Sequence, residues 1–175
     1  MSEMTARPMP GTPAPALEVA TADGVWRLAD SRPESFTVVV FYRGLHCPVC
    51  KGFLGELDGL VPAYADVGAE VIAVSMDSAE RAAQAVSDWG LSRLRVGHGL
   101  TEAQARAWGL YLSEAIRDTE PALFCEPGLF LIDGEGRFYL INIGSMPFAR
   151  PDIAGLPAKI GFAKEKGYPA RGTKV

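Results

Sequence analysis

The 175-residue sequence lacks the features that define several large classes of protein. It has no run that approaches the roughly 20 apolar residues of a membrane-spanning helix, so we expect no membrane association. It has no excess of basic residues, because 17 lysines and arginines stand against 21 aspartates and glutamates. The net charge of −4 argues against a broad nucleic-acid-binding surface. What remains is the composition of an ordinary globular protein, 48% hydrophobic and 22% charged.

Cysteine and histidine are also scarce, with three and two residues respectively. Three cysteines do not make a disulfide framework, and residues 1–5 have no apolar segment typical of a signal peptide. A structural zinc site needs about four ligands, and the sequence has no second Cys-x-x-Cys or His-x-x-His pair. We therefore expect a cytoplasmic protein with no metal site and no organic cofactor.

Two of the three cysteines, Cys47 and Cys50, lie in a Cys-Pro-Val-Cys motif. Residues 36–42, just before it, are β-branched and aromatic and predict a buried strand. Residues 51–64, just after it, have apolar side chains at spacings of three and four and predict an amphipathic helix. Cys47 is therefore expected at the amino terminus of a helix. The unpaired N–H groups and the helix dipole favour a thiolate there, which is the reactive form of cysteine.

The residues around Cys47 fit this interpretation. Arg43 and Gly44 supply the turn between the strand and the helix, and Pro48 suits the first helical position, where its missing N–H costs nothing. Cys50 is expected on the same helix face at about 5–6 Å, within reach of a disulfide. A Cys-x-x-Cys pair between a strand and a helix is more often catalytic than structural in a reducing compartment, so we interpret it as a redox site.

Residues 1–17 contain four prolines and predict an extended arm, followed by a single domain over residues 18–175. The further predicted elements are a short strand or turn at 25–28, a strand at 70–75, a helix at 78–89, a strand at 94–96, a helix at 101–109, a hairpin of strands 128–132 and 138–143, and a helix at 152–166. Pro157 either kinks the last helix or marks its start. This order predicts an α/β fold with a mixed central sheet and helices on both faces, in which the first two strands are parallel and the hairpin is antiparallel.

Five segments occur in an order that is typical of a known superfamily. They are residues 10–15, 41–50, 71–77, 108–111 and 130–136. Through them the chain resembles, over about residues 8–166, the thioredoxin-like superfamily. Within it, the chain is similar to the peroxiredoxin-like proteins of the alkyl hydroperoxide reductase and thiol-specific antioxidant group. The resemblance implies a thioredoxin-like fold and thiol-dependent redox activity.

The chain departs from the peroxiredoxin pattern at three positions. Peroxiredoxins carry a proline seven residues before the reactive cysteine and a threonine three residues before it. Counted back from Cys47, this chain has Val40 and Gly44 at those positions. Peroxiredoxins also carry an arginine where this chain has Pro127. Arg43 is the neighbouring residue that can replace the lost positive charge.

Three further residues are interpreted through the thioredoxin resemblance. Pro127 matches the cis-proline that packs against the Cys-x-x-Cys pair in thioredoxins, and we expect it to be cis; the alternative is an ordinary trans turn proline. His46 either stabilises the Cys47 thiolate as a protonated ring or is a surface histidine beside the turn. Cys125 is either a second resolving thiol at the rim of the site or a buried small hydrophobic residue.

The function that we predict is thiol–disulfide oxidoreduction, in which Cys47 attacks a disulfide and Cys50 resolves the mixed disulfide. The first alternative is peroxidase chemistry, in which Cys47 reduces a hydroperoxide and Cys50 or Cys125 condenses with the sulfenic acid. The second is a binding module without catalysis. The expected partners are protein or small-molecule disulfides, or hydroperoxides, with an external thiol reductant; a homodimer is compatible with the sequence.

Overall fold

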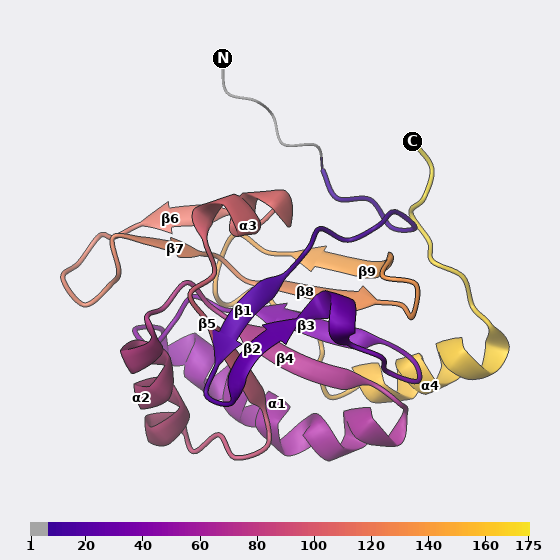
Figure 1. The fold of residues 1–175 in the computed structure, drawn as a ribbon, viewed down its shortest axis with the longest axis horizontal. Helices are drawn as coiled ribbons and strands as arrows, with labels where there is room; N and C mark the ends of the chain where they lie inside the picture. The colour runs from indigo at the N-terminus through magenta and orange to yellow at the C-terminus, as the bar shows by residue number, and fades with distance from the viewer. Residues whose placement is uncertain (1–6) are drawn as a thin grey trace.

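The computed structural model describes residues 7–175, which form a seven-stranded sheet in the order β2-β1-β5-β4-β3-β8-β9 (Figure 1). Its strands are β1 (Glu18–Thr21), β2 (Gly24–Arg27), β3 (Thr37–Phe41), β4 (Glu70–Val74), β5 (Arg95–His98), β8 (Gly128–Ile132) and β9 (Phe138–Ile143). Strands β3, β4 and β5 are parallel to one another. Strands β8, β9, β1 and β2 pair with their neighbours in the antiparallel sense. The predicted mixed sheet is confirmed: the strands predicted at 36–42 and 70–75, which are β3 and β4, are parallel, and the β8–β9 hairpin is antiparallel.

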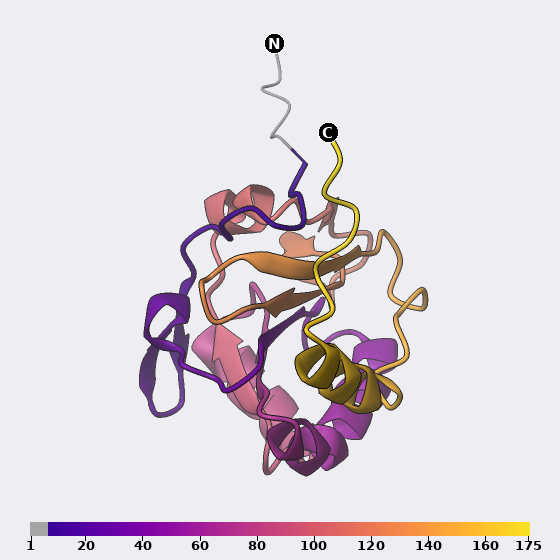
Figure 2. The ribbon, with the colours of Figure 1, turned by 90° about the vertical axis from the view of Figure 1, so that its right-hand side faces the viewer.

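Helices cover both faces of the sheet, as predicted (Figures 1 and 2). One face carries α1 (Pro48–Asp66), α2 (Ala79–Trp89) and α4 (Leu156–Lys166). The other carries α3 (Glu102–Ala107) and a separate strand pair, β6 (Leu112–Glu114) with β7 (Leu123–Cys125). A 3-10 turn, η1 (Leu28–Asp30), follows β2.

Strand β3 lies at the centre of this arrangement and is buried along its whole length. Val38 and Val40 pack on the side of α1, whereas Val39 and Phe41 pack on the side of the fully buried Trp108. A strand that is covered on both faces needs an uninterrupted apolar sequence, and this is what the β-branched run provides. The carboxyl end of β3 is thereby held rigidly, and the turn that leads to the two cysteines begins there.

Some elements differ from the expectation. Strands β1, β6 and β7 were not predicted, because they have three or four residues each and little apolar alternation. Helix α4 begins at Leu156, so Pro157 marks its start and does not kink it. The described part of the amino-terminal arm, residues 7–17, is tied to the hairpin, since Gly11 donates a hydrogen bond to the Phe138 carbonyl at 2.7 Å.

Within residues 7–175, every helix is too short or too polar to cross a membrane.

Candidate active site

The turn between β3 and α1 depends on a glycine and a buried carboxylate. Gly44 has a φ of +136°, a conformation that a residue with a side chain rarely adopts. A Cβ atom at Gly44 would lie 2.7 Å from the Asp77 carboxylate. That carboxylate, which follows β4, accepts the Leu45 N–H at 2.9 Å and so holds the turn in place. This packing explains why glycine, and not the threonine of peroxiredoxins, occupies position 44.

Cys47 follows the turn and is the N-cap residue of α1, and Pro48 is the first helical residue, as predicted. The Cys47 sulfur accepts the Cys50 N–H at 3.2 Å. A hydrogen bond from the Cys50 thiol is the largest cause that lowers the Cys47 pKa, to about 6. The Cys50 N–H and the Arg43 guanidinium lower the pKa further, while burial opposes them. Cys47 is therefore mainly a thiolate at neutral pH.

Cys50 has the opposite environment. It is fully buried, and burial together with the hydrogen bond to Cys47 raises its pKa. The Nη2 atom of Arg150, from the segment between β9 and α4, lies 2.8 Å from the Cys50 sulfur. Arg150 also stacks on Phe53, with 4.6 Å between the guanidinium carbon and the ring centroid. The sequence pattern did not single out Arg150, which is 100 residues away from Cys50.

Arg43 points into the site and forms an ion pair with a buried acid. Its Nε lies 3.1 Å from Oε2 of Glu126, whose side chain is 4% exposed. Glu126 also accepts a hydrogen bond from the Ser113 hydroxyl at 2.7 Å. The Arg43 guanidinium lies 4.8 Å from the centre of the Phe124 ring. Sequence reasoning missed Glu126, because one acidic residue next to a strand gives no signal of burial.

His46 does not supply positive charge to Cys47. Its ring packs on Phe124 at a centroid distance of 4.6 Å, and both ring nitrogens are buried without a hydrogen-bond partner. Burial, with the nearby Arg43 charge, lowers the His46 pKa, so the ring is neutral at neutral pH. The buried ring nitrogens and the lowered pKa count against the interpretation in which a protonated His46 stabilises the thiolate, and the ring is half-buried against Phe124.

Pro127 lies beside Arg150, which contacts Cys50, but its conformation differs from the expected one. All peptide bonds in residues 7–175 are trans, so the predicted cis-proline is wrong. The Pro127 carbonyl accepts the Gly144 N–H at 2.9 Å, which ties this extended segment to the end of β9. Its side chain lines a small space together with Phe53 and Arg150. Through Arg150, Pro127 borders the side of the site that holds Cys50.

Cys125 is not at the rim of the site. It is fully buried, and its thiol donates a hydrogen bond to the Tyr42 carbonyl at 3.4 Å. It belongs to the apolar cluster on the α3 side of the sheet, whereas Cys47 and Cys50 belong to the cluster on the α1 side. Burial raises its pKa to about 12. The interpretation as a second resolving thiol is therefore wrong, and the alternative of a buried small residue agrees with the structure.

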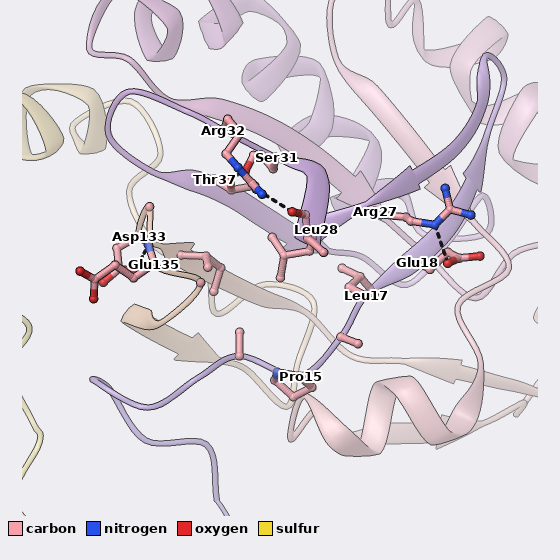
Figure 3. Close-up of a pocket in the computed structure, with 16 residues that line it drawn as sticks. Pro15, Leu17, Glu18, Arg27, Leu28, Ser31, Arg32, Thr37, Asp133 and Glu135 are labelled. Carbon is pink, nitrogen blue, oxygen red and sulfur yellow. Dashed lines mark hydrogen bonds and ion pairs between the residues drawn. The ribbon is translucent and has the colours of Figure 1, made fainter.

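A cavity of about 450 Å³ lies away from these cysteines. It is lined by Thr37, at the opposite end of β3 from the Cys47 turn, and by the hairpin loop that contains Asp133 and Glu135 (Figure 3). Its charged groups include Arg27, which pairs with Glu18 at 2.8 Å. In the described part of the chain, no three His, Cys, Asp or Glu side chains gather in a way that would hold a metal ion. Cys47, Cys50 and Cys125 are all free thiols.

Comparisons with known proteins agree with this geometry. A family model described as the AhpC/TSA family matches residues 10–139. A peroxiredoxin-like protein from Aquifex aeolicus has a similar structure, with a TM-score of 0.73 and 17% identity over 90% of this chain and 88% of that chain. The 2-Cys peroxiredoxin of Plasmodium vivax has a TM-score of 0.71 and 17% identity over 95% and 91% of the two chains.

A third similar structure is named for disulfide exchange and not as a peroxiredoxin. It is a putative thiol:disulfide interchange protein, DsbE, from Chlorobium tepidum, with a TM-score of 0.61 and 19% identity over 91% of this chain and 95% of that chain. No curated protein matches the sequence. At these identities the structural likeness shows the fold alone, and the fold is thioredoxin-like.

Proposed function

The chain belongs to the AhpC/TSA family and is a thiol-dependent oxidoreductase or peroxidase, and we propose that its own reaction is thiol–disulfide exchange through Cys47 and Cys50. The observation that carries this proposal is the hydrogen-bonded contact of the two cysteines at the start of α1, with Cys47 as the acceptor. One thiol is acidic and the other is held protonated beside it. This asymmetry is what a nucleophile and a resolving thiol require.

The reaction then has two steps. The Cys47 thiolate attacks one sulfur of a protein or small-molecule disulfide, forms a mixed disulfide and displaces the other sulfur as a thiolate. Cys50 loses its proton and attacks the Cys47 sulfur, which breaks the mixed disulfide and releases the second substrate thiolate. The substrate gains two electrons and the enzyme is left with a Cys47–Cys50 disulfide. An external dithiol reductant returns both cysteines to thiols.

Hydroperoxide reduction is the second candidate, and two observations favour it. Cys47 is only 1% exposed, which suits a small substrate, and the Arg43 guanidinium lowers the pKa of its thiol. Here the Cys47 thiolate attacks the terminal peroxide oxygen, the O–O bond breaks, and an alcohol (or water, from hydrogen peroxide) leaves, which gives a sulfenic acid on Cys47. The Cys50 thiol then condenses with the sulfenic acid to form the disulfide and releases a water molecule. Against this reaction, Gly44 and Pro127 stand where peroxiredoxins have a threonine and an arginine, and neither side chain can donate a hydrogen bond to a peroxide.

The two reactions are separated by stopped-flow oxidation of the reduced protein, first by hydrogen peroxide and then by a small aromatic disulfide. Each missing charge-assisted hydrogen bond is worth roughly 1.5–3 kcal/mol, so we expect peroxide attack to be on the order of a hundredfold slower than in a complete peroxidase site. Disulfide attack should be fast. Rapid peroxide oxidation that collapses in Arg43→Ala would favour the peroxidase instead, and reaction with neither oxidant would favour a binding module.

A further inference from the structure

The site contains two arginines, and each lies next to a different cysteine. The Arg43 side chain lowers the pKa of Cys47, whereas the Nη2 atom of Arg150 lies 2.8 Å from the sulfur of Cys50. The Arg150 guanidinium is held in place from two directions, because it stacks on the Phe53 ring and its Nε donates a hydrogen bond to the Pro147 carbonyl. Such fixation lowers the entropy lost when the guanidinium binds an anion.

Cys50 needs such a group for a chemical reason. Resolution requires a thiolate, but Cys50 is buried in apolar surroundings that favour the neutral thiol. In the reduced protein the hydrogen bond to Cys47 raises the Cys50 pKa further. Once Cys47 enters a mixed disulfide, its negative charge no longer raises the Cys50 pKa, but burial still does. A cationic group next to the Cys50 sulfur offsets that remaining penalty.

The titratable and charged groups that face Cys50 come from three elements. These groups are Cys47 at the start of α1, Tyr42 after β3 and Arg150 before α4. Burial raises the pKa of Tyr42, so its hydroxyl stays neutral. Of these groups, Arg150 alone carries a positive charge. Its Nη1 atom is also buried without a hydrogen-bond partner, so the guanidinium keeps an unused donor beside the reacting sulfur.

We propose that Arg150 is a catalytic residue of the second step, in which its guanidinium stabilises the Cys50 thiolate that attacks the Cys47 mixed disulfide. This assignment rests on the proposed disulfide exchange. In the step, a bond forms between the Cys50 and Cys47 sulfurs while the bond from Cys47 to the substrate sulfur breaks. The substrate leaves as a thiolate, and the proton that Cys50 released passes to solvent.

The test is stopped-flow reaction of the reduced protein with dithiobisnitrobenzoate, an aromatic disulfide that releases a coloured thiolate. The first equivalent reports attack by Cys47, and the second reports resolution by Cys50. Arg150→Met should slow the second phase on the order of tenfold or more and leave the first phase within about twofold. Its second-phase rate should also reach half of its maximum at a higher pH. Arg150→Lys, which keeps the charge, should recover part of the rate.

Controls separate this proposal from the reaction on which it rests. Arg171→Met removes an arginine from the exposed carboxyl-terminal segment, where it contacts Tyr168, and should change neither phase. A second phase that persists in Cys50→Ser would overturn the proposed exchange itself. A second phase that Cys50→Ser abolishes, but whose rate and pH dependence are the same in Arg150→Met as in the parent protein, would overturn only the role of Arg150.

Discussion

The Nε atom of Arg43 lies 3.1 Å from a carboxylate oxygen of Glu126, in a position where the acid is almost entirely enclosed. The same guanidinium lowers the pKa of Cys47. One side chain therefore serves two purposes: it compensates a buried charge and it favours the thiolate. Changes at Arg43 should alter both the stability of the protein and the reactivity of Cys47.

Arg43→Met should lower the free energy of unfolding by about 3 kcal/mol, because removal of one partner leaves the other charge buried and unpaired. Arg43→Met combined with Glu126→Gln should recover most of that loss, since no isolated charge remains. Urea denaturation under reducing conditions measures both values. Equal destabilisation in the single and double variants would show that the two residues are not energetically coupled.

Alkylation by iodoacetamide should label Cys47 first and leave Cys50 and Cys125 protected. The thiolate is the reacting form, and the Cys47 pKa is lowered to about 6. The labelling rate should therefore be low in acid, rise as the pH increases through about 6, and level off above it. Mass spectrometry of the labelled peptides at several pH values gives the order and the midpoint. Labelling of Cys50 ahead of Cys47 would reverse the assignment of the nucleophile.

Cys125→Ala should change neither phase of disulfide exchange by more than about twofold, because this thiol lies on the other side of the sheet from the redox pair. We expect a modest loss of stability, about 1 kcal/mol, since a small buried group and its hydrogen bond are lost. The measurement is the same stopped-flow assay, with urea denaturation of the variant. A missing second phase would mean that Cys125 takes part after all.

Gly44→Thr places the peroxiredoxin threonine back at its position and should not create a peroxidase. The backbone there has a φ of +136°, and the added Cβ would meet the Asp77 carboxylate. We expect a loss of stability of about 2 kcal/mol or more from strain alone. Peroxide kinetics and thermal unfolding test this together: a stable variant with faster peroxide reduction would contradict our account of the turn.

Local sequence patterns were sufficient to predict the strand, the turn and the helix that position Cys47. The continuous apolar run of β3, the proline at the first helical position and the spacing of apolar residues in α1 each depend on neighbours in the chain. Arg150 and Glu126 were not predicted, because their roles arise from contacts between segments that are distant in sequence. The conformation of Pro127 and the burial of Cys125 also depend on tertiary packing. The cis-proline expected from the resemblance to thioredoxins was wrong, whereas for Cys125 the sequence left two alternatives open and the buried one agrees with the structure.

The most direct test of disulfide exchange is to trap its intermediate. The reduced Cys50→Ser and Cys47→Ser variants are each mixed with a small aromatic disulfide, and intact mass is measured under conditions that preserve disulfides. Our account predicts a stable mixed disulfide on Cys47 in Cys50→Ser and no adduct on the buried Cys50 in Cys47→Ser. Equal adduct formation in the two variants, or none in either, would contradict the assignment of Cys47 as nucleophile and Cys50 as resolving thiol.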